Sequence, residues 1–469
     1  MQENNDKENL SDDEKKKIIK KNRRLHIIDM YMIRTFFAVL IICAFLAQFP
    51  ALRPTVSSSE HRKLKEFPKL TVKTLFSGDF FDGINLWFSD TFPCRDSLMT
   101  FNGFITGTFG KSDVQIHGTV ENGDEIPDIN SSSPSSEPEK PPKNEQSSKA
   151  EENNTSSKPS AQKQEKHVSE TLDAMLIVDN SAYEYYNFRR SCADSYAAKI
   201  NKAVKNLKGK ANVYCIIAPN SMAITAPESI TKSVNSSDQK KAIDYMYSKM
   251  SKKVKKVDAY SALKAHRDEY IYFRTDHHWT ARGAYYAYAQ MMKEKGATAA
   301  KLSDFKEYKF KGFLGTFYSA SGKKRRLGAT PDTVVAYEPR QLDRIKTKIS
   351  KSTVKDFHIV SNGNDLSAPD KYMTYICGDH PVGVMTNPKI KDKSTCIVIK
   401  ESYGNAFVGF LTQNYRKVIV VDYRYIRTVD KRTLAGFVKD YSVGDVVFMN
   451  NISATRTEGL ISELGRFIG

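Results

Sequence analysis

The chain has 469 residues, which is enough for one large domain or two smaller ones with a real hydrophobic core. Lys and Arg number 72 against 54 Asp and Glu, so the formal net charge of +18 favours anionic polymers or lipid headgroups as partners. The sequence contains no basic motif interleaved with aromatic residues and no Cys-x-x-Cys pair, which argues against nucleic-acid binding, a zinc ribbon and a thiol redox centre.

The N-terminal segment joins a basic tail to an apolar run. Seven of the ten residues from 15 to 24 are Lys or Arg, and the uncharged stretch TFFAVLIICAFLAQF occupies 35–49. We expect 1–33 to be a cytoplasmic tail and 34–49 a single transmembrane anchor, which places the rest of the chain outside the cell. A cleaved signal peptide is the competing interpretation, but no Ala-x-Ala site follows the apolar run.

Two segments of different composition follow the anchor. Residues 50–120 mix aromatic side chains with Gly, Asp and Pro, and we expect them to form an ordered N-terminal part of the ectodomain. Residues 130–166 contain no aromatic residue and no Val, Ile or Leu. Without apolar area to offset the entropy of ordering, 121–167 are predicted to be a disordered linker or insertion.

The remainder, 168–469, has the pattern of an α/β catalytic domain. Strands alternate with helices, which predicts a mostly parallel sheet with helices on both faces. The expected strands are 174–180, 211–220, the two ends of 394–424, and 443–451; the expected helices are 196–209, 240–254, a short one within 394–424, and 455–468. Cys215 and Cys396 lie inside apolar runs and are predicted to be buried thiols.

The stretch FRTDHHWTARGAYYAY, residues 273–288, holds an acid and two imidazoles ahead of a helix that Thr280 is expected to cap. An aspartate two residues before a histidine can fix its tautomer, so Asp276 is predicted to orient His278 as a general base. Trp279 is expected to pack in the core.

The stretch VIKESYGNAF, residues 398–407, places Ser402 at a sharp turn between an apolar strand and a helix. A nucleophilic serine needs this position, because the amides at the start of a helix can receive an oxyanion. Ser402, His278 and Asp276 would then supply the nucleophile, base and orienting acid of acyl-transfer chemistry. A simpler interpretation of Ser402 is that it merely caps the helix.

A metal site is the alternative for the histidine pair, since imidazole and carboxylate groups bind zinc and iron. His380 in the stretch GDHP could add a ligand. Adjacent residues rarely reach one ion, however, and no His-x-x-x-His pattern lies nearby. We therefore predict no metal and no cofactor.

Together, TDHHWT and the downstream ESYGNAF resemble the DHHW protein family, which is related to the alginate O-acetyltransferase group of SGNH-hydrolase-like proteins. The resemblance implies an SGNH-like three-layer sandwich. It assigns the triad to Asp276, His278 and Ser402 and puts His277 at a variable, supporting position. The family's own oxyanion residues, a Gly and an Asn from separate blocks, have no clear counterpart here, and we expect the Ser402 amide with Asn405 or Asn220 to take that role. Glu401 is a departure, because many relatives carry Asp before the serine.

The predicted function is a membrane-anchored extracellular O-acyltransferase, most simply an O-acetyltransferase, that modifies a cell-wall or exported polysaccharide. The resemblance implies that a separate multispanning acyltransferase of the MBOAT type delivers the acyl group. Two alternatives stay open: a carbohydrate esterase using the same triad, and a non-catalytic glycan-binding scaffold.

Overall fold

The computed structural model describes residues 174–231 and 234–469 without a gap, and parts of 30–38, 53–97 and 114–129. The chain divides into two compact units, Met1–Thr108 and Phe109–Gly469. Within the described residues, no helix combines the length and the apolar character needed to cross a membrane. The predicted anchor, 34–49, and the predicted linker, 121–167, lie largely outside those residues.

Among its described residues, the first unit contains a short antiparallel pair of strands and a twelve-residue helix. The strands are β1 (Val56–Ser57) and β2 (Arg62–Lys63), and the helix is α3 (Asp79–Asp90). Trp87 on the helix packs edge-on against Phe67, with ring centroids 4.8 Å apart. The guanidinium of Arg53 lies over the Trp87 ring, 4.0 Å from its centroid. These aromatic contacts join Arg53 and Phe67 to α3, while an ordered 50–120 as a whole stays a prediction.

The second unit is organised around an eight-stranded mixed sheet in the order β11-β10-β12-β14-β13-β15-β6-β7. Strands β14, β13, β15, β6 and β7 run parallel, whereas β12, β10 and β11 join antiparallel at one side. The strand bounds are β6 (Asn212–Ala218), β7 (Val254–Val257), β10 (Arg344–Lys348), β11 (Val354–His358), β12 (Val382–Thr386), β13 (Thr395–Lys400), β14 (Lys417–Asp422) and β15 (Asp445–Asn451).

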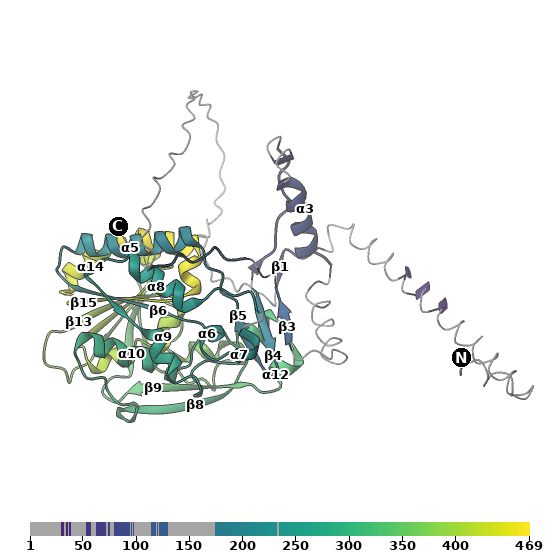
Figure 1. Cartoon of the computed structure of the whole chain (residues 1–469). Coiled ribbons are helices and arrows are strands. Elements are labelled where there is room, and N and C mark those ends of the chain that lie inside the picture. The colour runs from purple at the N-terminus through teal and green to yellow at the C-terminus, as the bar shows by residue number, and fades with distance from the viewer. Residues whose placement is uncertain are drawn as a thin grey trace, which may run out of the picture. The chain divides into compact units, whose positions relative to one another are not determined.

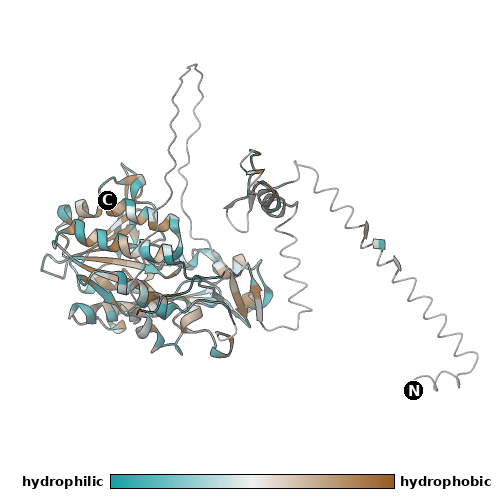
Figure 2. Cartoon of the chain, turned by 45° about the horizontal axis from the view of Figure 1, so that its top comes forward, coloured by the Kyte–Doolittle hydropathy of each residue, from teal (hydrophilic) through white to brown (hydrophobic). Residues whose placement is uncertain are grey.

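Helices cover both faces of this sheet (Figure 1). One face carries α5 (Arg190–Leu207), α8 (Gln239–Lys249), α13 (Ile426–Val429), α14 (Leu434–Tyr441) and α15 (Glu458–Ile468). The other carries α9 (Ala259–Lys264) and α10 (Ala281–Lys295). The central strands belong to both cores because successive side chains point to opposite faces: Ile216 packs in one cluster and Ile217 in the other. The inside of the sheet is coloured as hydrophobic in Figure 2.

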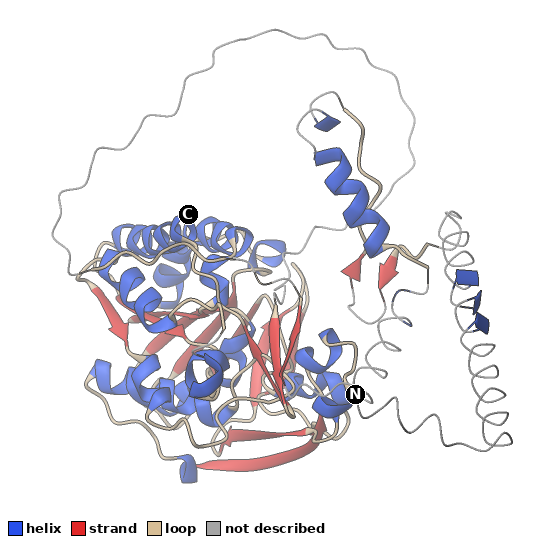
Figure 3. Ribbon diagram, turned by 45° about the vertical axis from the view of Figure 1, so that its right-hand side comes forward, coloured by secondary structure: helices blue, strands red, loops and turns tan. Residues whose placement is uncertain are grey.

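Smaller β elements and short helical turns surround this frame. A three-stranded antiparallel sheet is separate from the large one (Figure 3), and a long hairpin lies on the α10 side. These strands are β3 (Val114–His117), β4 (Met175–Val178), β5 (Ser181–Glu184), β8 (Phe305–Phe313) and β9 (Asp332–Pro339). The short helices are α6 (Ser221–Ile224), α7 (Glu228–Thr231), η2 (Leu302–Asp304), α11 (Thr316–Ala320), α12 (Arg325–Gly328), η3 (Ala368–Thr374), η4 (Ser402–Ala406), η5 (Phe410–Gln413) and η6 (Ser453–Arg456).

The structure corrects the predicted sheet in two respects. The large sheet is mixed rather than mostly parallel, because β11 pairs antiparallel with β10, β10 with β12, and β12 with β14. The strand predicted at 174–180 is β4, which pairs with β3 and β5 in the separate small sheet. Cys215 and Cys396 are fully buried free thiols, as predicted.

Candidate active site

The two sequence stretches singled out for chemistry meet at the carboxyl end of β13. This strand lies inside the parallel part of the sheet, and Ser402 follows its last residue by two positions. The turn continues into the short helix that the sequence predicts, which is the 3₁₀ helix η4. The buried carboxylate of Glu401 fixes the turn by accepting the backbone N–H groups of Tyr403 at 2.8 Å and Asn451 at 2.7 Å.

The imidazole of His278 bridges Asp276 and Ser402. Its Nδ1 lies 2.6 Å from Asp276 Oδ1, and its Nε2 lies 2.7 Å from Ser402 Oγ. An ionised carboxylate can only accept hydrogen bonds, so Nδ1 carries the proton and Nε2 offers its lone pair to the serine hydroxyl. A longer contact of 3.3 Å joins the same hydroxyl to Glu401. The arrangement orients the Ser402 proton for transfer to His278.

Asp276 is almost completely buried, with 2% of its surface exposed. Burial alone would raise the pKa of its carboxyl. The facing His278 and His277 rings and the Thr316 amide outweigh that effect and hold the pKa below its usual range. Asp276 therefore stays ionised at neutral pH and favours an imidazolium on His278 whenever one forms.

Aromatic residues fix the histidine ring and the serine turn relative to each other. Tyr372 stacks on His278 with centroids 3.8 Å apart, and its hydroxyl donates to the Ser402 carbonyl at 3.0 Å. Trp279 is fully buried, and its indole N–H donates to the Tyr403 carbonyl at 3.0 Å. The prediction that Trp279 packs in the core is confirmed, and its hydrogen bond ties the two stretches together.

The loop before Asp276 is held by a second buried carboxylate, Asp332, at the start of β9. Its Oδ2 accepts the N–H of Thr275 at 2.8 Å and the Thr275 hydroxyl at 2.6 Å. Its other oxygen, Oδ1, accepts a hydrogen bond from the Tyr270 hydroxyl and lies 3.2 Å from the Arg274 guanidinium in an ion pair. Asp332 was not singled out from the sequence, since it lies 56 residues beyond Asp276 and in no motif.

Thr316, at the start of α11, is a further supporting residue that the sequence did not identify individually. Its N–H and hydroxyl donate to Asp276 Oδ2 at 2.8 and 3.0 Å. The oxygen of the same hydroxyl lies 2.7 Å from His277 Nδ1 and accepts a hydrogen bond from Nδ1–H. His277 therefore supports the Asp276 carboxylate indirectly, through Thr316. Thr316 lies in the stretch GFLGTFYSASG, residues 312–322, and no local pattern there marks it as a site residue.

Gly315 permits the close approach of this segment. A Cβ added at Gly315 would lie 2.3 Å from the Cβ of Asp276, which is far closer than real carbon atoms approach. The backbone of 315–316 can therefore lie against the carboxylate only because this position has no side chain.

The two asparagines predicted as oxyanion groups take part in other bonds. Asn405 donates from Nδ2 to Asp379 at 2.9 Å. Asn220 caps α6: its Oδ1 accepts from Met222 N at 3.1 Å, and its Nδ2 donates to the Glu184 carbonyl at 3.2 Å. The structure thus brings Asp276, His277, His278 and Ser402 together, whereas an oxyanion role for either asparagine stays a prediction.

A metal ion is the competing use of the same residues. Asp276, His277 and His278 each offer a ligand atom, and these atoms lie within 4.8 Å of one another. Both ring nitrogens of His278 already have partners in the triad. A metal would have to displace Asp276 or Ser402 from this ring, so the donor set fits the hydrogen-bonded arrangement better.

A family model described as DHHW protein matches residues 60–137 and 144–421, about three quarters of the chain. The chain belongs to the DHHW protein family. The four letters of the family name coincide with Asp276, His277, His278 and Trp279. No curated protein matches the chain.

Solved structures agree with this family placement. A DHHW family protein from Eubacterium siraeum is 25% identical, with 64% of this chain and 96% of that chain covered and a TM-score of 0.54. PatB1 of Bacillus cereus has the same fold in two structures. One, with a sulfonyl adduct, is 18% identical, with 63% of this chain and 98% of that chain covered and a TM-score of 0.52. The other is 19% identical, with 61% of this chain and 98% of that chain covered and a TM-score of 0.51.

Proposed function

We propose that this DHHW protein is an O-acyltransferase, most simply an O-acetyltransferase, that modifies a cell-wall or exported polysaccharide. One observation carries the proposal: His278 lies within hydrogen-bonding distance of both Asp276 and Ser402. This is the geometry that acyl transfer through an activated serine requires. The SGNH-like character implied by the sequence resemblance is part of the same proposal.

In the first half-reaction, Ser402 Oγ attacks the carbonyl carbon of an acyl donor while His278 Nε2 takes the hydroxyl proton. The tetrahedral intermediate then expels the leaving group, which receives that proton from His278. An acyl-serine ester remains. Asp276 holds Nδ1–H throughout and stabilises the imidazolium, because its carboxylate stays ionised.

In the second half-reaction, a sugar hydroxyl attacks the acyl-serine carbonyl and loses its proton to His278 Nε2. Collapse of the intermediate returns the proton to Ser402 Oγ and releases the acylated sugar. If water attacks instead of the sugar, the products are a free acid and unmodified glycan. Transferase and esterase therefore differ only in which hydroxyl reaches the acyl-enzyme.

The proposed setting is the outer face of the cell membrane, with a cytoplasmic N-terminus and the catalytic domain outside. The basic tail and the apolar run at 34–49 support it. A multispanning MBOAT-type acyltransferase would supply the acyl group from the cytoplasmic side. Protease added to intact cells should then degrade the catalytic domain, and protection of that domain until lysis would reject the topology.

The test of the triad is the hydrolysis of p-nitrophenyl acetate by the full chain. Ser402→Ala should lower the rate by about a hundredfold or more, because the nucleophile is removed. Ser248→Ala is the matched control, since Ser248 lies on α8 and its hydroxyl bonds only the Tyr245 carbonyl at 2.7 Å. Equal rates for wild type and Ser402→Ala would remove Ser402 from the mechanism.

A sulfonyl fluoride gives a second readout that does not need turnover. PatB1 of Bacillus cereus has been solved with a sulfonyl adduct. On this chain, Ser402 Oγ would form the S–O bond, fluoride would leave, and the hydroxyl proton would pass to His278. Mass spectrometry should find one adduct on Ser402 and none on the Ser402→Ala chain.

The acceptor decides between the two enzyme activities. The full chain should be incubated with p-nitrophenyl acetate and a neutral oligosaccharide such as cellotetraose or chitotetraose. An increase of one acetyl mass on the sugar supports the transferase. Release of acetate alone, with removal of acetyl groups from an acetylated oligosaccharide, identifies an esterase.

A further inference from the structure

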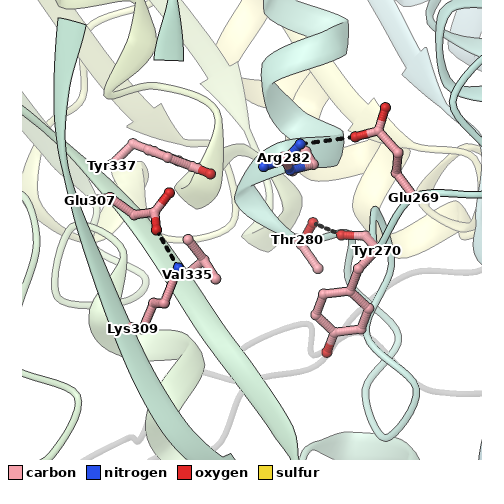
Figure 4. Close-up of a pocket in the computed structure, with 8 residues that line it drawn as sticks. All are labelled: Glu269, Tyr270, Thr280, Arg282, Glu307, Lys309, Val335 and Tyr337. Carbon is pink, nitrogen blue, oxygen red and sulfur yellow. Dashed lines mark hydrogen bonds and ion pairs between the residues drawn. The ribbon is translucent and has the colours of Figure 1, made fainter. Parts of the chain in front are cut away.

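A cavity of about 330 Å³ opens beside the loop that carries the triad (Figure 4). No triad residue lines it. Its walls are formed by Glu269, Tyr270, Thr280, Arg282, Glu307, Lys309, Val335 and Tyr337. This volume lies at the lower end of the range for small-molecule sites, about 300–1,000 Å³.

One wall is a face of the β8–β9 hairpin. Glu307 pairs with Tyr337 and Lys309 pairs with Val335 across the two strands. Partners of this kind, two residues apart along each strand, point to the same face. Glu307 and Lys309 also form an ion pair of 2.7 Å.

The opposite wall comes from the loop before α10 and from its first turn. Arg282 forms an ion pair with Glu269 at 3.0 Å. Glu269 also accepts the hydroxyl of Tyr286 at 2.7 Å. Tyr270 is 38% exposed, and its carbonyl accepts the Thr280 hydroxyl at 2.9 Å. Figure 4 shows Glu269, Tyr270, Thr280 and Arg282 across the cavity from the hairpin wall.

The charges of the cavity cancel in pairs. The ion pair with Lys309 lowers the pKa of Glu307, and the hydrogen bond to Glu269 raises the pKa of Arg282, so all four groups stay charged at neutral pH. No excess charge is left to recognise an ion. The wall instead presents charged donors beside charged acceptors, which form stronger hydrogen bonds with neutral hydroxyls than neutral groups do.

Aromatic surface completes the chemistry of the site. The rings of Tyr270 and Tyr337 line opposite walls. A tyrosine ring offers an apolar face and a polar edge. A sugar ring has matching features, with C–H faces and a rim of hydroxyl groups.

We propose that this cavity binds a neutral sugar residue of a glycan chain. The inference rests on the proposed function, because it names a place where that enzyme would hold its polysaccharide. The cavity touches the triad loop at two points. Thr280 follows His278 by two residues, and the Tyr270 hydroxyl bonds Asp332, which holds Thr275 next to Asp276.

The test is calorimetric titration of the full-length Ser402→Ala chain, in mild detergent, with chitotetraose and cellotetraose. Removing the nucleophile separates binding from chemistry. We expect saturable binding of at least one of these sugars, and at least tenfold weaker binding of anionic tetragalacturonate. Absence of binding by both neutral sugars, or equal binding of the anionic one, would overturn the proposal.

Variants of the hairpin locate the binding. The double change Glu307→Ala with Lys309→Ala removes one charge pair from the cavity face, and Val335→Trp fills the cavity without altering charge. Each should weaken binding at least tenfold. Lys306→Ala with Glu338→Ala is the matched control, because these residues pair across the same strands on the opposite face. If the control weakens binding as much as the cavity variants do, the sugar binds elsewhere.

The outcomes separate this inference from the proposed function. Cavity-dependent sugar binding without p-nitrophenyl acetate turnover by the wild-type chain would leave the sugar site standing and reject the enzyme. Ser402-dependent turnover without cavity-dependent binding would support the enzyme and reject the sugar site.

Discussion

The acid of the triad gains its properties from the bonds around one carboxylate. Asp276 accepts two bonds from His278, from its backbone N–H and its Nδ1, and two from Thr316. These four bonds use both oxygens and compensate for the loss of water. A buried aspartate with fewer donors would take up a proton and lose its ability to orient the histidine.

Replacing Asp276 with Asn should make stability less dependent on pH. The folded-state pKa of Asp276 lies below its usual value of about 3.9, so its ionised form stabilises the fold at higher pH. That stabilisation is complete above about pH 5 and is lost as the pH falls below about 4 towards the folded-state value. We expect the variant to be less stable by about 2–3 kcal/mol at pH 6, with a smaller difference at pH 3.

Urea unfolding of wild type and Asp276→Asn at several pH values measures this difference. Asp356→Asn is the control, because Asp356 is exposed on β11 and should change stability by less than about 0.5 kcal/mol at each pH. A wild-type advantage that grows towards low pH would contradict the assigned direction of the pKa.

The loop from Tyr270 to Thr280 owes its shape to contacts with other elements. Asp332 on β9 holds Thr275, the backbone N–H of Ala182 on β5 donates to the Arg274 carbonyl at 2.9 Å, and that of Tyr318 on α11 donates to the Thr275 carbonyl at 3.0 Å. Three elements distant in sequence therefore fix the position of Asp276, which a loop of this length could not adopt alone.

Asp332→Asn should lower kcat for p-nitrophenyl acetate about tenfold to a hundredfold while KM changes little. The amide has the size of the carboxylate, but its NH₂ group would face donors in place of an acceptor. The loop would shift, and small misplacements of a catalytic group cost rates of this order. Asp440→Asn, an exposed change on α14, is the control. An unchanged kcat would show that Asp332 does not position the triad.

The molecule as a whole places the proposed triad at the carboxyl ends of the parallel strands, a common position for sites in α/β folds. Buried charges gather at the same edge. Lys400 and Asp422 are paired residues at the ends of β13 and β14, and their side chains form a fully buried ion pair of 3.0 Å. Asp379 also contacts Lys400 at 3.0 Å. Burial lowers the pKa of Lys400, but Asp379 and Asp422 outweigh this effect and raise it.

Asp422→Asn should therefore destabilise the whole second unit. It leaves Lys400 buried with half of its compensation, and breaking such a pair costs about 3–5 kcal/mol. The free energy of unfolding in urea measures the loss. Arg466→Gln breaks an exposed pair with Glu463 on α15 and should cost less than about 1 kcal/mol. Similar losses in the free energy of unfolding for the two variants would mean that the buried pair stabilises the fold no more than an exposed pair does.

Local patterns in the sequence were sufficient for the elements that consist of continuous apolar runs. β6, β13, β14, β15 and α10 lie where periodicity and capping placed them, and Thr280 is the N-cap of α10. α5 begins six residues before the predicted start at 196, and α8 ends five residues before the predicted end at 254. The three residues proposed as the triad were singled out in the same way, from an acid–histidine pair beside a helix start and a serine at a strand end. These signals are local, because they depend on neighbours along the chain.

What local patterns could not supply were the partners that come from elsewhere in the chain. The antiparallel strands β10, β11 and β12 carry weaker apolar patterns, and their pairing is set by contacts across the sheet. Asp332 and Thr316 have no distinctive sequence surroundings. Their importance arises only from their hydrogen bonds to Thr275 and Asp276 in the folded chain. The sugar cavity likewise exists only because a hairpin face and a helix start come together. The chain alone thus specifies which groups are able to react, and folding specifies which groups hold them, since hydrogen bonds and burial act through space rather than along the sequence.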